Sequence, residues 1–202
     1  MVPMRIHPSH ITEAEVVERQ RLGLDHHDEE WEGVYHVTPA PTVNHQDVMG
    51  GIYQFLKTVV AARGGGRVLL EVNVFRGKAR KTDYCVPDVA FVCAGREGIV
   101  AKDGTRGGAP DVVIEILSPR DESYAKFGFY AAIGVPEIII VEPESRRPEI
   151  WKLEAGAYTK VLAGPDGTLV SNRMEISFRM LPGEPPRLEV VDRRDESRRL
   201  SI

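Results

Sequence analysis

Two carboxylates inside short hydrophobic runs place the strongest constraint on how this chain can fold. The runs Val86–Val92 and Ala109–Pro119 consist largely of β-branched and other apolar residues, and each has a proline at its start. Such runs are too short for typical helices and are typical of buried strands. An ionised carboxylate in a strand that is apolar on both faces must be paired, hydrogen-bonded or metal-bound, because desolvating it alone costs several kcal/mol. Asp88 and Glu115 therefore require partners.

Strand geometry limits which carboxylates can act together. Asp111 and Glu115 lie on one strand and one face, but four residues of strand separate them by roughly 13 Å, too far to share an ion. Asp111 is therefore predicted to mark the entry to its strand. If the two strands are antiparallel neighbours, Asp88 lies beside Glu115, with the backbones about 4.8 Å apart. That separation suits one hard cation held by two carboxylates.

The segment from Glu122 to Gly134 is predicted to form a helix after the second carboxylate strand. Gly134 is a typical residue for ending a helix. Lys126 lies on the apolar face of this helix, at i, i+3, i+4 and i+7 spacing with Phe129, Tyr130 and Ile133. The simpler interpretation is that the aliphatic part of the Lys126 side chain packs on the sheet while its ammonium group reaches water. The alternative is that Lys126 is the third member of the carboxylate site.

Four ordered blocks resemble the signature series of the Uma2 family, which is regarded as a restriction-endonuclease-like branch of the PD-(D/E)xK phosphodiesterases. The blocks are Asp83-Tyr84-x-Val86-Pro87-Asp88, Ala109-Pro110-Asp111-x-Val113-x-Glu115-Ile116-Leu117-Ser118-Pro119, Glu122-Ser123-Tyr124-x-Lys126-x-x-Phe129-Tyr130-Ala131, and Gly134-Val135-Pro136-Glu137. The resemblance is ungapped within each block and covers roughly residues 40 to 150.

The resemblance implies a role for each buried charge. Asp88 takes the PD aspartate role, Glu115 the (D/E) role and Lys126 the lysine role, so these three would be catalytic. Asp88, Glu115 and the carbonyl of Ile116 would hold a divalent cation, Mg²⁺ or Mn²⁺. The chain departs from the pattern at Leu117, where Glu-x-Lys would place its lysine, so the lysine must reach in from the following helix. It also departs at Cys85, where close relatives are expected to carry a basic residue.

The order of predicted elements favours an α/β (α+β) fold with a restriction-endonuclease-like core, in which helices flank a mixed sheet. Residues 44–142 form this core: a helix capped by Asn44, a strand over Arg67–Phe75, the two carboxylate strands, the Lys126 helix and a strand over Glu137–Glu142. All 202 residues are expected to form a single domain.

The two ends are predicted to add to this core. Residues 1–37 supply an N-terminal helix and an edge strand, and the resemblance implies a hairpin turn at Glu32-Gly33. Residues 148–190 add a β extension with a hairpin turn near Ala155-Gly156, which would extend the sheet or contact a second copy. The tail from Arg193 to Arg199 is expected to fray.

Composition bounds the partners and the compartment. The net charge of -4 and the pI of about 5.9 argue against tight nonspecific binding to nucleic acid, because phosphate affinity comes largely from Lys and Arg. They do not exclude a nuclease, because a metal ion can offset the local field. Cys85 and Cys93 fall eight apart in one predicted strand and are expected to be free thiols of a reducing cytosol. We find no signal peptide and no membrane-length apolar run, so a cytoplasmic protein is expected.

Several further residues are candidate members of the site. The run His26–Glu30 resembles a metal cluster, but adjacent side chains on a solvated acidic run diverge. His45 could contact DNA or a metal-bound water, although capping or packing is favoured. Glu71 is a candidate extra carboxylate that is expected at the rim. The basic segment Arg76–Lys81 steers a phosphate backbone or is a plain solvated loop, and the Gly-rich loop Cys93–Ala109 could cover substrate.

These observations predict a metal-dependent nuclease that hydrolyses phosphodiester bonds, with DNA as substrate, acting as a homodimer away from the membrane. The main alternative is a noncatalytic protein that uses the endonuclease fold to bind nucleic acid or protein, and the acidic charge balance favours it. A small-molecule enzyme with a carboxylate pair would explain the same residues but not the matched blocks.

Overall fold

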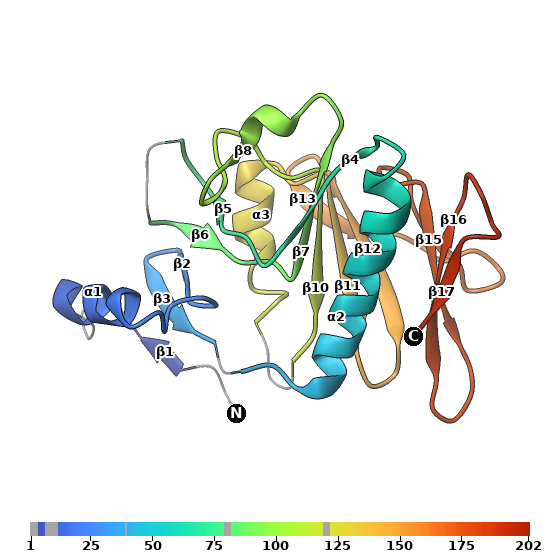
Figure 1. The fold of residues 1–202 in the computed structure, drawn as a ribbon, viewed down its shortest axis with the longest axis horizontal. Helices are drawn as coiled ribbons and strands as arrows, with labels where there is room; N and C mark the ends of the chain where they lie inside the picture. The colour runs from blue at the N-terminus through green and yellow to red at the C-terminus, as the bar shows by residue number, and fades with distance from the viewer. Residues whose placement is uncertain (1–3, 7–11, 39, 79–81, 119–121) are drawn as a thin grey trace.

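The computed structural model describes residues 4–6, 12–38, 40–78, 82–118 and 122–202 (Figure 1). These residues form three β-sheets together with the helices α1 (Glu13–Arg21), α2 (Val43–Leu56) and α3 (Phe127–Ile133). A π-helical turn, Lys57–Ala61, extends α2. The architecture is therefore mixed α/β, as predicted.

A six-stranded mixed sheet forms the centre of the molecule. Its strand order is β13-β12-β11-β10-β7-β4. The strands are β4 (Gly66–Leu70), β7 (Val89–Cys93), β10 (Val112–Ile116), β11 (Glu137–Glu142), β12 (Arg147–Glu154) and β13 (Ala157–Lys160). Strand β10 pairs antiparallel with β7 and parallel with β11, which confirms the predicted neighbours. The β12–β13 hairpin turns at Ala155-Gly156, also as predicted.

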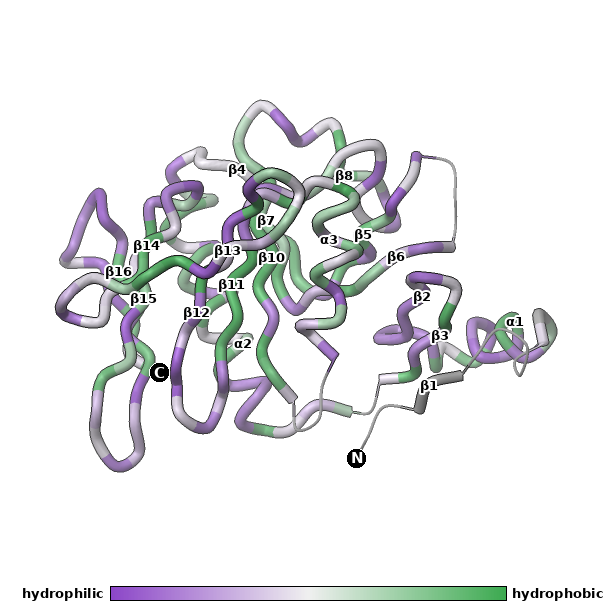
Figure 2. The backbone as a smooth tube through the Cα atoms, turned by 180° about the vertical axis from the view of Figure 1, so that it is seen from behind, coloured by the Kyte–Doolittle hydropathy of each residue, from purple (hydrophilic) through white to green (hydrophobic). Residues whose placement is uncertain are grey.

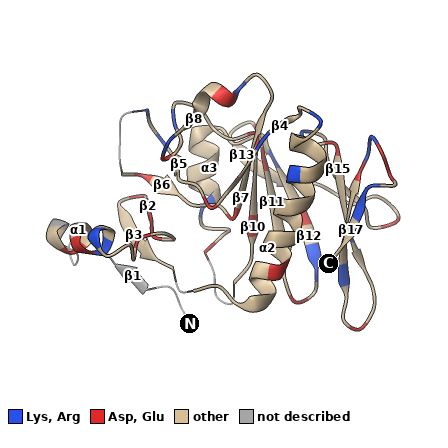
Figure 3. Cartoon of the chain, viewed as in Figure 1, with Lys and Arg blue, Asp and Glu red and all other residues tan. Residues whose placement is uncertain are grey.

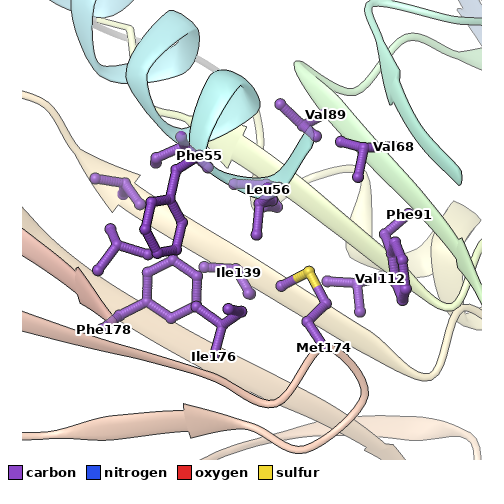
Figure 4. Packing of buried hydrophobic residues seen from close by; sticks show 14 of the residues in the cluster. Phe55, Leu56, Val68, Val89, Phe91, Val112, Ile139, Met174, Ile176 and Phe178 are labelled. Atoms are coloured by element: carbon purple, nitrogen blue, oxygen red, sulfur yellow. The ribbon is translucent and has the colours of Figure 1, made fainter. Parts of the chain in front are cut away.

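Helix α2 covers one face of the central sheet. Thr42, rather than the predicted Asn44, caps it, because the Thr42 hydroxyl accepts a hydrogen bond from the His45 N–H at 3.2 Å. Apolar side chains of α2, including Phe55 and Leu56, pack against alternate strand residues such as Val112 and Ile139 (Figure 4). Figure 2 shows the central strands coloured largely as hydrophobic, in keeping with burial on both faces.

A four-stranded C-terminal sheet packs onto the same core. Its strands, in spatial order, are β14 (Leu169–Ser171), β15 (Ile176–Leu181), β16 (Arg187–Asp192) and β17 (Arg199–Ser201). Met174, Ile176 and Phe178 reach the α2 side of the core (Figure 4). The prediction of a frayed tail is wrong, because β17 pairs with β16 and the backbones of Leu188 and Ile202 exchange two hydrogen bonds. These main-chain bonds outweigh the high charge of the segment.

Helix α3 and the N-terminal sheet cover the opposite face. The strand order is β1-β3-β2-β6-β5-β9-β8. The strands are β1 (Met4–Ile6), β2 (Glu29–Trp31), β3 (Val34–Val37), β5 (Val74–Phe75), β6 (Tyr84–Cys85), β8 (Val100–Ala101) and β9 (Gly104–Thr105). The predicted hairpin turn is confirmed, since Glu32 and Gly33 have φ of 53° and 73° between β2 and β3. A second core joins this sheet to α3 through Trp31, Val74 and Phe129.

Three predicted elements differ from the structure. The strand over Arg67–Phe75 is interrupted, because Glu71 has φ of 46° and turns the chain between β4 and β5. The predicted strand that holds both cysteines is also divided, because residues 86–88 separate β6, which contains Cys85, from β7, which contains Cys93; both thiols are free, as expected. The loop Cys93–Ala109 is not structureless, since it contains a 3₁₀ turn at Glu97–Ile99 and the β8–β9 hairpin.

Three predictions fall partly outside the described residues. In the N-terminal segment 1–37 these are residues 1–3 and 7–11. In the basic segment they are Ala79, Arg80 and Lys81, and in the second matched block it is Pro119. Within the described ranges, none of the helices combines the length and the apolar character that crossing a membrane requires.

Candidate active site

The pairing of β7 with β10 brings the two predicted carboxylates together. Val89 is the partner of Ile114 in this antiparallel register, so Asp88, directly before β7, stands beside Glu115. The backbone N–H of Ile116 donates to Asp88 Oδ2 at 2.6 Å. This hydrogen bond fixes one carboxylate oxygen of Asp88. The other oxygen, Oδ1, lies on the side of His45.

Glu115 is buried on the face of the sheet that α3 covers. Only 3% of the residue is exposed. Strand alternation turns Val112, Ile114 and Ile116 toward α2 and leaves Glu115 facing α3. There the Tyr130 hydroxyl donates to Glu115 Oε1 at 2.6 Å. Burial, together with the nearby charges of Asp88 and Glu29, outweighs the opposing effect of Lys126 and raises the pKa of Glu115 to about 8.

Lys126, which is the residue directly before α3, lies in the same site. The helix begins at Phe127 rather than at Glu122 as predicted, and it ends at Gly134 as predicted. The Lys126 ammonium does not reach past the sheet to water, because Nζ lies 3.3 Å from Glu115 Oε1 and 2.7 Å from Glu29 Oε1. Burial alone would lower the pKa of Lys126, but Glu115 and Glu29 raise it well above its ordinary value. Lys126 is therefore a charged member of the cluster.

Glu29 is the site residue that the sequence prediction missed. It lies on β2 and only 4% of it is exposed, so the prediction that it belongs to a solvated acidic run is wrong. Its Oε1 accepts a hydrogen bond from the Val86 N–H at 2.7 Å, and its Oε2 accepts one from Trp31 Nε1 at 3.2 Å. The signal in the sequence was the alternation of Glu29 and Trp31 on one short strand face.

His45 also faces the site. Its Nε2 lies 3.4 Å from Asp88 Oδ1, and the ring is buried on the first turn of α2. The favoured interpretation as a capping or packing residue is incomplete, because the cap is Thr42 and the ring contacts a carboxylate. Its place on α2 follows from the predicted helix, but its contact with Asp88 depends on how α2 crosses the sheet.

These residues line one pocket of about 380 Å³. Glu71 stands on its wall, as expected, with Oε1 at 3.3 Å from Nδ1 of the half-exposed His27. Among the described lining residues five carry carboxylates and Lys126 alone is a lysine or arginine. The carboxylates are Glu29, Glu71, Asp88, Glu115 and Glu122. Figure 3 agrees, with acidic segments in β2 and near β10 while most Lys and Arg lie in peripheral loops and near the C-terminal sheet.

Cys85 does not line this pocket. It is wholly buried with Trp31 and Val74 in the core beside α3, and burial raises the pKa of its thiol well above the ordinary value. Because Cys85 is buried in this core, it is not placed to contact a phosphate.

The donor set fits a hard divalent cation. Asp88 and Glu115 present carboxylates to one pocket, and the pKa of Glu115 is raised first by burial and then also by the charge of Asp88. Over the described part of the chain, no cluster of three or more His, Cys, Asp or Glu is arranged to hold a metal ion. Two carboxylates with one backbone carbonyl suit Mg²⁺, which keeps several waters in protein sites, better than zinc, which takes three or four protein ligands.

Comparison with known proteins supports this fold and gives the family. A crystal structure described as that of a putative nuclease belonging to DUF820, from Anabaena variabilis, matches with a TM-score of 0.58 and 19% identity, over 73% of this chain and 83% of that one. At that identity the likeness shows a shared fold. Among curated proteins the chain has no match. Residues 16–181 match the model of the Uma2 family, described as putative restriction endonuclease, and the chain therefore belongs to this family.

Proposed function

We propose that this protein hydrolyses phosphodiester bonds, with DNA as substrate, and that the reaction depends on Mg²⁺ or Mn²⁺. The observation that carries the proposal is the convergence of Asp88, Glu115 and Lys126 on one pocket, with Lys126 Nζ at 3.3 Å from Glu115. Membership of a family described as putative restriction endonuclease supports a nuclease-like function.

Asp88 and Glu115 are the carboxylates that would hold the cation, together with the carbonyl of Ile116. When bound, the cation would polarise a phosphoryl oxygen and lower the pKa of an attacking water. The Ile116 N–H bond to Asp88 and the Tyr130 hydroxyl bond to Glu115, both 2.6 Å long, orient the two carboxylates. Such hydrogen bonds orient the ligands of a metal, and removing one typically costs about 10- to 100-fold in metal affinity or activity.

Lys126 is the group that would act on the reacting atoms. Its ammonium is buried, charged and within the pocket, so it can orient the attacking water and stabilise the negative charge that develops on the phosphoryl group. The low exposure of its side chain, 12%, strengthens these interactions because little water screens them.

The charge of the site favours a reaction that needs a cation. A phosphodiester would meet five carboxylates in the pocket, and a divalent ion offsets part of that field. The noncatalytic alternative rests on the same acidity and on the net charge of -4. It predicts that the chain binds a partner without cutting DNA.

The test is cleavage of supercoiled plasmid, linear duplex and single-stranded DNA with Mg²⁺ or Mn²⁺ at low salt. Asp88→Asn and Lys126→Met should each lower the nicking rate by about 100-fold or more, the usual effect of removing a catalytic group. Asp103→Asn and Lys57→Met alter exposed residues of the same types, and they control for nuclease activity carried through the purification. The homodimer expected from the sequence stays a prediction, and light scattering on the same samples checks it.

The outcomes separate the candidates. Nicking that depends on metal and is lost in both site variants supports the nuclease. If no DNA is cut but calorimetry shows Mn²⁺ binding that Asp88→Asn abolishes, the metal site stands and the substrate is wrong. If DNA is not cut and no binding of metal depends on Asp88, the noncatalytic alternative is favoured.

A further inference from the structure

The ammonium of Lys126 lies between two buried carboxylates from different parts of the chain. Glu29 comes from β2 in the N-terminal sheet, and its Oε1 is 2.7 Å from Lys126 Nζ. Glu115 comes from β10 in the central sheet, and its two oxygens are 3.3 and 3.4 Å from the same nitrogen. The shorter contact is with the carboxylate that is not a proposed cation ligand.

Glu29 is held firmly on its own strand. The Val86 N–H donates to its Oε1 at 2.7 Å, and the Trp31 indole donates to its Oε2 at 3.2 Å. Trp31 is itself stacked on His36, with ring centroids 4.1 Å apart and planes 7° from parallel. Glu29 is therefore a fixed negative charge, placed by the β2–β3 hairpin and the residues beside it.

We propose that Glu29 is a positioning residue, which takes the closer contact with Lys126 at 2.7 Å and so keeps the contact of Lys126 with Glu115 at the longer distance of 3.3 Å. The inference rests on the proposed function. With Glu29 in place, Lys126 has a partner that is not a cation ligand, so Glu115 can turn its charge to the cation while the ammonium stays in the pocket. Without the charge of Glu29, the ammonium would pair with Glu115 alone and more closely, and a cation would have to displace it.

A double-mutant cycle on Mn²⁺ affinity tests this role without any need for catalysis. Glu29→Gln removes the charge but keeps an oxygen that can accept from Val86. In the native background this change should weaken Mn²⁺ binding, measured by calorimetry, by about tenfold. In the Lys126→Met background it should weaken binding by less than about twofold, because no ammonium is left to compete for Glu115.

Glu71→Gln is the matched control for the loss of charge alone. Glu71 lines the same pocket and has no contact with Lys126, since its ion pair is with His27. It should weaken Mn²⁺ binding by less than about threefold, as expected for a charge that acts only through the field of the site. If Lys126→Met does not fold, as judged by circular dichroism, the comparison of Glu29→Gln with Glu71→Gln decides the question.

The outcomes distinguish this inference from the proposed function. A tenfold loss in the native background that disappears in the Lys126→Met background supports it. Equal losses in both backgrounds, or equal losses for Glu29→Gln and Glu71→Gln, overturn the positioning role and leave the metal site standing. No Asp88-dependent binding of Mn²⁺ by the native chain would overturn the proposed function and this inference with it.

Discussion

The two ends of strand β10 carry buried carboxylates in opposite circumstances. Asp111, directly before the strand, is 1% exposed and Glu115, near its other end, is 3% exposed. Asp111 pairs with Arg96 at 2.5 Å and Arg173 at 3.3 Å, and it accepts a hydrogen bond from the Cys93 N–H at 2.8 Å. Glu115 shares a single lysine with Glu29 and lies beside Asp88.

The difference separates a carboxylate whose partners satisfy it from one whose partners do not. Two guanidinium groups and a backbone N–H satisfy Asp111, which ties the start of β10 to the loop after β7 and to the C-terminal sheet. Glu115 has too few positive partners and a raised pKa, which is a cost that folding alone does not require. A carboxylate in a cleft whose pKa is shifted by burial and by a charged neighbour is a candidate for a functional role.

The largest effect should come from removing the lysine at the Glu115 end. Lys126→Met leaves Glu29 buried without its cation, and at pH 7 we expect it to lower the free energy of unfolding by about 3 kcal/mol. The loss should shrink as pH falls from about 8 toward 4.5, because the folded variant then takes up a proton on Glu115, which the unfolded chain keeps ionised. Urea denaturation at several pH values measures it.

Lys57→Met is the control for that experiment, because Lys57 is an exposed residue at the end of α2. It should change stability by less than about 0.5 kcal/mol at every pH. A Lys126→Met variant as stable as the native chain at pH 7 would contradict the view that this ammonium compensates buried carboxylates.

The second effect concerns cation affinity and pH. Because the pKa of Glu115 is raised to about 8, binding of a cation below that pH must release the proton of Glu115. Affinity for Mn²⁺ should therefore rise about tenfold per pH unit from pH 6 to 8, and then level off. Calorimetry across this range, in two buffers of different ionisation enthalpy, measures both the affinity and the released proton.

Asp111→Asn is a useful comparison in the same titration. Asp111 directly precedes the same strand but belongs to the satisfied cluster, so the pH dependence of Mn²⁺ affinity should match that of the native chain. An affinity that is flat between pH 6 and 8 in the native chain would mean that Glu115 is ionised before the cation arrives.

The third effect is on stability at the Asp111 end. Asp111→Asn keeps an acceptor for the Cys93 N–H but loses the charge that pairs with two arginines. We expect a loss of about 2 kcal/mol, less than for a fully buried pair, because Arg96 and Arg173 are both half-exposed and can turn to water. Thermal and urea unfolding measure it, and a loss above that of Lys126→Met would reverse the comparison.

The part of the site that could be predicted is the part that is local in sequence. Asp88 and Glu115 are conspicuous because they interrupt apolar strands, and the short distance between their strands along the chain favours the antiparallel pairing that is observed. Lys126 follows on the next segment. The turn at Ala155-Gly156 and the helix end at Gly134 likewise follow from local signals.

The rest depends on contacts between distant segments. Glu29 belongs to an acidic run that would be solvated on its own strand, and only docking of the β2–β3 hairpin against the central sheet buries it. The contact of His45 with Asp88 requires the crossing of α2 over the sheet. Glu71 reaches the pocket because the backbone turns there with positive φ, which an alternating apolar pattern does not reveal.

The smallest effect should come from one arginine of the satisfied cluster. Arg173→Gln removes the longer of the two ion pairs of Asp111, at 3.3 Å, from a side chain that is 48% exposed. Because Arg96 and the Cys93 N–H remain, we expect a loss of less than about 1 kcal/mol. That loss should not vary between pH 6 and 8, in contrast with Lys126→Met. A larger or pH-dependent loss would show that Asp111 relies on both arginines, and the two ends of β10 would then differ less than their geometry indicates.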